Sequence, residues 1–307
     1  EVNGDRIVKK IILLGSRDNQ GKNDVTKLAA ALAGKEQLSV QTVYLEDLLF
    51  EIGSKKQSIT DTKSQLYLAK ADLVLVFNWY KSGAKSFYRD AAFTIGLYLK
   101  NRGVDFWNQE MVSQRSTTKL SAMMQLALLG HDVPETTFAL DPKVLAGQAS
   151  AFPLILKSIS ASRGRLNFLV KDQAELAEHL GASDHFMLQE YIPNDGDFRI
   201  VCFGDEPKLA IYRQRTSANT HLNNTSQGAK ATLQEVSKLD PKVVSACKQI
   251  CREMGRQMAG IDFIEANDGS SRQVYLEVNA IPQLTSGSFV DEKLQALGIT
   301  IEEYLTR

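Results

Sequence analysis

The chain is poor in the features that mark secreted, membrane-bound or nucleic-acid-binding proteins. Among its 307 residues are only three cysteines, an odd number that argues against a disulfide framework and suits a reducing compartment. No apolar stretch approaches the length of a membrane span, and lysines interrupt the apolar segment near the start, so we predict neither a membrane anchor nor a signal peptide. The 36 Lys and Arg balance the 36 Asp and Glu, which leaves no net field to attract nucleic acid or an anionic membrane. We therefore expect a cytoplasmic protein without nucleic-acid or membrane partners.

Several catalytic signatures are missing as well. The four histidines show no metal-ligand spacing, and there is no Gly-x-Ser-x-Gly or Cys/His signature of a covalent nucleophile. No Gly-x-Gly-x-x-Gly follows the first expected strand, which argues against a dinucleotide-dependent dehydrogenase. The segment 15–23 has five residues between its glycines rather than the four of a phosphate loop, and Asn23 stands where Ser or Thr would hold Mg²⁺. We interpret it as a strand-to-helix turn in the ligand crevice of a sheet.

What the chain does have is an ordinary globular composition, with 43% hydrophobic and 23% charged residues, and enough length for two or three packed units. The first third alternates short apolar runs with helical patterns, which predicts an open, mostly parallel sheet of the α/β class. Its strands are expected at residues 7–14, 38–44, 72–77 and 103–107, and its helices at 24–32 and 87–100. The remainder is typical of an α+β unit, with helices expected at 117–129, 172–180 and 241–258, strands at 152–158, 166–170, 186–192, 198–203 and 209–213, and a long polar loop at 216–230.

The most informative local pattern is a pair of apolar runs separated by turn residues at 267–272. This pattern predicts a β-hairpin that places Asp262 opposite Glu277, with Asn279 two residues further along on the same face. Burying unpaired carboxylates is expensive, and a bound cation would remove that cost. Oxygen ligands of this kind suit Mg²⁺, which commonly also binds nucleotide phosphates. An amphipathic hairpin with a solvated polar face is the alternative interpretation.

A lysine lies near the end of one apolar run in the α+β part of the chain. Lys157 lies near the end of the strand expected at 152–158, directly before a loop rich in Ser and Gly that ends at Arg165. A lysine in such a run should not face a core unless an anion meets it, and the backbone N–H groups of the loop could hold phosphate. The alternative is an edge-strand lysine that extends its ammonium group into solvent beside a mobile turn.

Charged side chains also alternate along the two strands that follow. Asp197 and Arg199 share one face of their strand, which fits either a binding site or a cross-strand ion pair. Arg213 and Arg215 likewise share a face, and two like charges there favour an anion between them. Exposure of both arginines to solvent is the alternative.

In their order and spacing, these residues resemble the ATP-grasp superfamily over residues 115–289, and most closely its RimK-type branch of ribosomal-protein glutamate ligases and related amino-acid ligases. Its two phosphate-binding lysines match Lys119 and Lys157, the first of them at the start of the helix that precedes Gly-His-Asp-Val-Pro at 130–134. Its other nucleotide-binding positions match the hinge residues Gln189, Glu190, Tyr191 and Ile192, then Asp197 of an Asp-x-Arg motif and, loosely, Asn224. Its metal ligands match Asp262, Glu277 and Asn279, and its catalytic residues match Arg199, Arg213 and Asn279.

The resemblance implies a Rossmann-like pre-ATP-grasp domain over residues 1–114, a central lid subdomain over 115–188 and a C-terminal α+β subdomain with the metal site over 189–307. It also implies an ADP-forming ligase that joins a carboxylate substrate to an amine acceptor (an amino acid, a peptide or a protein tail) through an acylphosphate. The cofactors would be ATP and Mg²⁺, with two metal ions and with Mn²⁺ as an alternative metal. Ligases of this kind often form homo-oligomers.

Three further roles follow from the resemblance. The backbone groups of Glu190 and Tyr191 would meet the edge of the adenine. The loop at 158–165 would close over the site, because water would hydrolyse the acylphosphate. Arg213 would stabilise that intermediate and its developing charge.

The chain departs from the RimK pattern in two segments near the phosphates or the acceptor. It has Ser-Gln-Gly-Ala at 226–229 where that branch usually has His-Arg-Gly-Gly, and Ala-Ile-Pro-Gln at 280–283 where the family has Ala-Ser-Pro-Gly. The identity of both substrates, and single addition versus polymerisation, therefore stays open. Two other functions stay open as well: an ATP-grasp kinase that phosphorylates a small molecule, and a nucleotide-binding module without catalysis.

Overall fold

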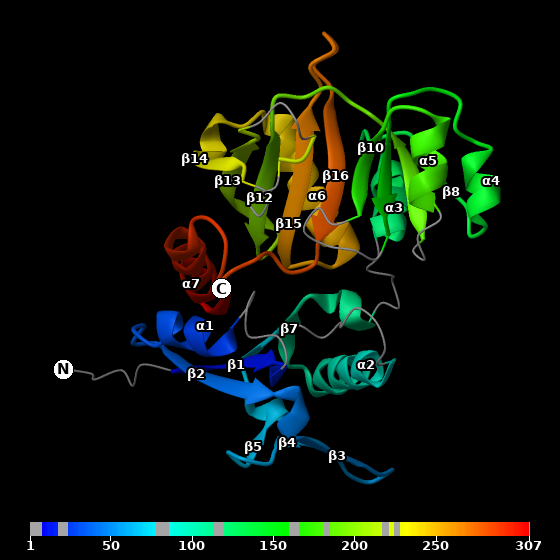
Figure 1. Ribbon diagram of the computed structural model, residues 1–307. Coiled ribbons are helices and arrows are strands. Elements are labelled where there is room, and N and C mark those ends of the chain that lie inside the picture. The colour runs from blue at the N-terminus through cyan, green and yellow to red at the C-terminus, as the bar shows by residue number, and fades with distance from the viewer. Residues whose placement is uncertain are drawn as a thin grey trace.

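The computed structural model describes residues 8–17, 24–77, 86–112, 119–159, 166–180, 185–216, 221–223 and 228–306. In Figure 1 an N-terminal unit lies at the bottom, and two further sheets formed by the rest of the chain lie above it. None of the helices within these ranges is long and apolar enough to cross a membrane.

The N-terminal unit is built on the predicted parallel sheet, in the order β2-β1-β6-β7. The sheet comprises β1 (Lys9–Gly15), β2 (Leu38–Tyr44), β6 (Leu73–Val76) and β7 (Asp105–Trp107), and its helices are α1 (Val25–Leu32) and α2 (Ser86–Arg102). The apolar runs of β1 and β6 are buried on both faces, as expected of inner parallel strands. Asp24 starts α1, because its carboxylate accepts hydrogen bonds from the N–H groups of Thr26 and Lys27.

A small antiparallel sheet extends from this unit, and the sequence pattern does not predict it. It consists of β3 (Leu48–Ile52), β4 (Gln57–Asp61) and β5 (Leu66–Tyr67). β3 exposes the apolar side chains of Leu49 and Ile52, so that neither a buried run nor a regular alternation marks it as a strand.

The second sheet, β10-β9-β11-β8, is antiparallel and has a hydrophobic core of its own. It comprises β8 (Thr136–Phe138), β9 (Leu154–Ser158), β10 (Asn167–Val170) and β11 (Phe186–Glu190), with helices α4 (Pro142–Ala146) and α5 (Gln173–Leu180). Leu145, Leu156, Leu176 and Phe186 are among the buried residues that bring these helices and strands together.

The third sheet, β14-β13-β12-β15-β16, is antiparallel as well. It is formed by β12 (Asp197–Phe203), β13 (Glu206–Gln214), β14 (Lys230–Gln234), β15 (Met258–Glu265) and β16 (Gln273–Asn279), and helices α3 (Lys119–Leu128) and α6 (Pro241–Met254) share a core with it. The predicted end of α6 at residue 258 is wrong, because Gly255 caps the helix at φ 65° and Met258 already begins β15. Edge strand β14 has mostly exposed residues, which explains why no apolar pattern revealed it.

Helix α7 (Val290–Leu305) joins the N-terminal unit to the five-stranded sheet. It lies between α1 and that sheet in Figure 1, and its Leu297 and Ile301 belong to one continuous core with the parallel sheet and with Val201 of β12. The predicted fold class, an α/β unit followed by α+β sheets, is confirmed. The predicted domain limits stay predictions, and α3 packs on the five-stranded sheet although it falls within the expected lid subdomain.

Candidate active site

The expected hairpin forms from β15 and β16, and its register brings the proposed metal ligands together. Asp262 pairs directly with Glu277, and Gly260 with Asn279, so the two carboxylates are neighbours across the ladder. Asn279 is two residues beyond Glu277 and therefore shares its face. The chain reverses through Gly269 at φ 82° and Ser271 at φ 55°, both in the left-handed region.

These three side chains offer oxygen donors that fit Mg²⁺. The half-buried Glu277 carboxylate has no ion-pair or hydrogen-bond partner among the described residues. The side-chain nitrogen of Asn279 donates to the Gly260 carbonyl at 3.5 Å, which leaves its amide oxygen available. No group of three or more His, Cys, Asp or Glu that could hold a metal occurs in the described ranges, so a cation here would complete its coordination with water or with phosphate oxygens.

Asp262 also belongs to a network of two carboxylates and two guanidinium groups on β12, β13 and β15. Arg199 donates from Nε and Nη2 to Asp262 at 2.7 and 2.6 Å, and Arg213 contacts Asp197 in the same way at 2.7 and 2.6 Å. The Nη2 atom of Arg213 lies 3.2 Å from Oδ2 of Asp262, which links the two pairs. The cross-strand ion pair considered for Asp197 and Arg199 is therefore confirmed, with each residue paired to a neighbouring strand.

The network keeps Asp262 ionised and makes Asp197 easier to protonate. Burial would raise the pKa of Asp262, but the charges and hydrogen bonds of Arg199 and Arg213 outweigh it and lower that pKa to about 2. Burial raises the pKa of Asp197 to about 6, with Arg213 opposing the rise and the charge of Asp262 adding to it. At neutral pH Asp262 is therefore a carboxylate, and a cation there would share its oxygens with the two arginines.

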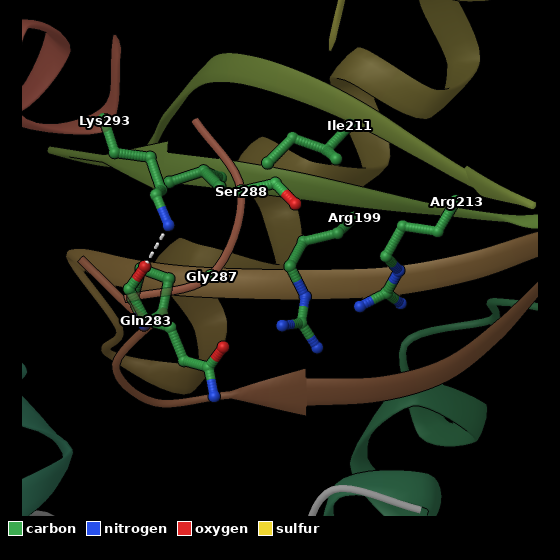
Figure 2. A pocket seen from close by; sticks show the side chains of 9 residues that line it. Arg199, Ile211, Arg213, Gln283, Gly287, Ser288 and Lys293 are labelled. Carbon is green, nitrogen blue, oxygen red and sulfur yellow. Dashed lines mark hydrogen bonds between the residues drawn. The ribbon is translucent and has the colours of Figure 1, made fainter. Parts of the chain in front are cut away.

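In each arginine of the network, the Nε and Nη2 groups bind carboxylates of the described residues and the Nη1 group does not. The Nη1 groups of Arg199 and Arg213 have no acceptor among the described residues. Figure 2 shows both guanidinium groups reaching into the same pocket. An anion in that pocket would find two charged N–H donors that no residue in the described part of the chain occupies.

Arg213 and Arg215 bind different partners. Arg213 is only 5% exposed, so the interpretation that both arginines face solvent is wrong. Arg215 donates instead to the side chain of Asn223 at 3.4 Å and to the backbone carbonyl of Asn194 at 2.7 Å. The predicted nucleotide contact Asn224, and residues 160–165 of the expected lid loop, lie outside the described residues.

Of the two predicted phosphate-binding lysines, one contacts the metal-ligand hairpin and the other contacts β9. Lys157 lies on β9, an inner strand of its sheet, so the edge-strand interpretation is wrong. Its Nζ atom donates to the carbonyl of Leu276 at 3.4 Å, the residue that precedes Glu277 on β16. The Nζ atom of Lys119, at the start of α3, donates to the Ser158 carbonyl at 3.2 Å. The contact of Lys157 therefore reaches the metal-ligand strand β16, whereas that of Lys119 reaches the end of β9.

The predicted adenine hinge lies at the end of β11. The buried Gln189 donates from Nε2 to the Thr136 hydroxyl at 2.9 Å, and the buried Ile192 packs with Ile264 of β15. The backbone N–H of Glu190 donates to the Glu135 carbonyl at 3.0 Å, so this N–H is not available to adenine.

The pocket beside the arginines contains a lysine that the sequence did not reveal. Lys293 of α7 is 3% exposed and donates to the carbonyl oxygens of Gln283 and Ser286. Figure 2 shows its ammonium group at one end of the pocket. A signal existed, because Lys293 lies four residues before the buried Leu297 on the same face of one helix. The residues that line the pocket are Arg199, Val201, Ile211, Arg213, Pro282, Gln283, Gly287, Ser288 and Lys293.

We expect Lys293 to make stability rise with pH. Burial, helped by the charge of Arg199, lowers its pKa from 10.5 to about 8, so between these values the unfolded chain binds more protons than the native state. The free energy of unfolding of the wild type should therefore rise relative to that of Lys293→Met, by up to about 3 kcal/mol, across this pH window. Urea titrations at pH 7 and pH 10 measure the difference, with Lys230→Met at an exposed position of β14 as the control. A constant or falling difference would contradict the assignment.

More than half of the chain matches a known family model. Residues 116–302 match the RimK-like ATP-grasp domain. The chain belongs to this family. The solved ATP-grasp ligase PsnB, in a complex with a minimal precursor, aligns with a TM-score of 0.71 and 17% identity over 98% of this chain and 100% of that one. D-alanyl-alanine synthetase A from Vibrio cholerae aligns with a TM-score of 0.65 and 13% identity over 97% and 98%. The predicted ATP-grasp fold is therefore confirmed.

Curated RimK-like relatives match over part of their length. A probable alpha-L-glutamate ligase from Alkalilimnicola ehrlichii is 30% identical over 186 residues, which are 58% of this chain and 60% of the relative. The ribosomal protein bS6–L-glutamate ligase of Escherichia coli O7:K1 is 29% identical over 187 residues, again 58% of this chain and 60% of the relative. The match thus spans less than two thirds of these relatives.

Proposed function

We propose that this RimK-like chain is an ATP-dependent ligase that joins a carboxylate to an amine and releases ADP and phosphate. The observation that carries the proposal is the contact of Lys157 with the Leu276 carbonyl of β16, the residue before Glu277, because a lysine there could bind a phosphate that a cation on Asp262 and Glu277 also binds. Family membership and the names of the relatives support the same chemistry.

The residues of the site would bind the nucleotide and the metal. Lys119 and Lys157 would hold the phosphates of ATP, with the adenine against the hinge at 189–192. Asp262, Glu277 and Asn279 would hold Mg²⁺, which when bound neutralises charge on the phosphates. We further propose that two metal ions bind at this site and that Mn²⁺ can replace Mg²⁺.

The reaction would have two steps. An oxygen of the substrate carboxylate bonds to the γ-phosphorus while the bond from that phosphorus to ADP breaks. The resulting acylphosphate is anionic, and the uncommitted Nη1 edges of Arg199 and Arg213 supply donors for it. The amine nitrogen then attacks the acyl carbon, phosphate leaves with the bonding electrons, and the amine loses a proton to solvent. The protein itself forms no covalent bond.

We propose that the substrates are an amino acid and a second amino acid, peptide or protein tail. The relatives are named as glutamate ligases, and the solved PsnB complexes contain precursor peptides, so glutamate and short peptides are the first candidates.

Release of ADP from ATP and Mg²⁺ in the presence of single amino acids, pairs of amino acids and peptides tests the proposal. A ligase should release ADP only when both substrates are present, with a product mass equal to their sum less one water. ADP release with a single substrate and a stable phosphorylated product would indicate the kinase. Nucleotide binding without turnover in any mixture would indicate the binding module.

A further inference from the structure

A buried ion pair connects the N-terminal unit to the strand that carries two of the proposed metal ligands. Glu110 follows β7, Arg256 follows α6, and both side chains are 1% exposed with Nε and Oε2 2.7 Å apart. The second arm of the arginine does not face the acid: Nη1 donates to the carbonyl of Val278 on β16 at 2.5 Å. The guanidinium group of Arg256 therefore binds both Glu110 of the N-terminal unit and the Val278 carbonyl of β16.

Asn108 makes a second connection two residues before Glu110. Its Nδ2 donates to the Ala280 carbonyl at 2.8 Å, and its Oδ1 accepts from the Met258 N–H at 2.9 Å. The residue is fully buried and has φ 68°, a left-handed conformation that Asn tolerates better than most residues. Its own N–H donates to Oε1 of Gln257 at 2.8 Å, so backbone and side chain both engage the start of β15.

The two carbonyl groups held in this way flank a metal ligand. Val278 lies between Glu277 and Asn279, and Ala280 follows Asn279. Because side chains alternate along a strand, the orientation of the peptide groups at 278 and 280 decides where the side chains of 277 and 279 point. Asn108 and Arg256 hold these peptide groups through their carbonyl oxygens, and in the described part of the chain neither hydrogen-bonds to the side chain of a proposed metal ligand.

We propose that Asn108 and Arg256 are positioning residues that hold β16 so that Glu277 and Asn279 face Asp262. The inference rests on the proposed metal site. It makes the placement of the N-terminal unit a determinant of cation affinity, because residues 108–110 come directly after β7 of its parallel sheet. Gly255 shows how close the two units approach here: a Cβ atom at this position would lie 3.2 Å from the backbone nitrogen of Glu110.

Two conservative variants separate positioning from packing. Asn108→Asp keeps the size, the tolerance for positive φ and the acceptor for Met258, but it loses the donor to Ala280. Arg256→Lys keeps a positive charge for Glu110, but a single ammonium group cannot reproduce the fork that also reaches Val278. Glu302→Gln is the matched control, because it weakens another connection between the units, the pair of Glu302 with Lys35, which does not involve β16.

The decisive measurement is the Mn²⁺ dissociation constant of each full-length variant, by electron paramagnetic resonance, alongside the Mg²⁺ dependence of ADP release. We expect Asn108→Asp and Arg256→Lys to weaken Mn²⁺ binding by roughly 10- to 100-fold, as changes behind metal ligands do, and to raise the KM for Mg²⁺ more than they lower kcat at saturating Mg²⁺. Glu302→Gln should leave both values unchanged.

Each outcome bears on a different claim. Equal Mn²⁺ affinity in the wild type and both variants would overturn the positioning role and leave the metal site intact. Equal Mn²⁺ affinity in the wild type and in Glu277→Gln would overturn the metal site itself. If Arg256→Lys fails to fold, Asn108→Asp and Asn108→Gly carry the test, because both leave the ion pair in place and tolerate the backbone conformation.

Discussion

Replacement of Glu277 by Gln should lower ATP turnover by roughly 100-fold or more, because losing a metal-assisted stabilisation of several kcal/mol has an effect of that size. The substitution keeps the shape of the side chain and removes only its charge. Since the Glu277 carboxylate has no partner among the described residues, the change should leave the free energy of unfolding almost unaffected. ADP release at saturating ATP, measured as Mg²⁺ is raised, shows whether activity is lost and whether extra metal restores part of it.

Glu265→Gln provides the control for this experiment. Glu265 lies on the same hairpin at an exposed position opposite Gln273, and it undergoes the same chemical change without touching the site. We expect its turnover to match the wild type. Unchanged turnover in Glu277→Gln, in a preparation that is active as wild type, would remove Glu277 from the metal site.

Truncation of Glu110 to Ala should destabilise the protein by about 3 to 5 kcal/mol, the range found when one partner of a buried ion pair is removed. The reason is that Arg256 would keep a buried charge, and among the described residues the Val278 carbonyl is the other hydrogen-bond partner of its side chain. Burial already raises the pKa of Glu110, with the charge of Arg256 opposing that rise, so the carboxylate depends on its partner. Urea denaturation at neutral pH measures the loss.

The double variant Glu110→Leu with Arg256→Met distinguishes a charge effect from a packing effect. Replacing a whole buried pair by apolar side chains is often close to neutral, so the double variant should recover most of the stability that the single change removes. It should still bind Mn²⁺ weakly, because methionine cannot hold the Val278 carbonyl. If the double variant is as unstable as Glu110→Ala, the loss of stability comes from altered packing and not from the unpaired charge of Arg256.

The sequence was sufficient wherever the determinants are local. The β15–β16 hairpin follows from turn residues and alternation, and its predicted facing of Asp262 and Glu277 is confirmed by the register. The buried strands β1 and β6 follow from continuous apolar runs. The exposed strands β3 and β14 have no such pattern, so their pairing could not be predicted from hydrophobicity.

The electrostatic contacts of the site could not be predicted in the same way, since their partners are distant in the sequence. Arg199 and Asp262 are separated by 63 residues, and Glu110 and Arg256 by 146. Arg199 was assigned from the Asp-x-Arg motif, but only the fold shows which acid it meets. Glu110 carries no local signal, because a charged residue after a short strand is ordinarily exposed.

The antiparallel sheet β10-β9-β11-β8 has a hydrophobic core of its own, and this affects how ligands enter and leave. Lys157 reaches β16 from that sheet through a hydrogen bond to the Leu276 carbonyl, whereas the hairpin belongs to the neighbouring core. Tilting one sheet away from the other breaks polar contacts of this kind and leaves each hydrophobic core intact. Subglobal opening along such a boundary requires less free energy than global unfolding. We therefore expect the two sheets to separate while each keeps its hydrophobic core, so that a ligand between Lys157 and the hairpin would exchange without global unfolding.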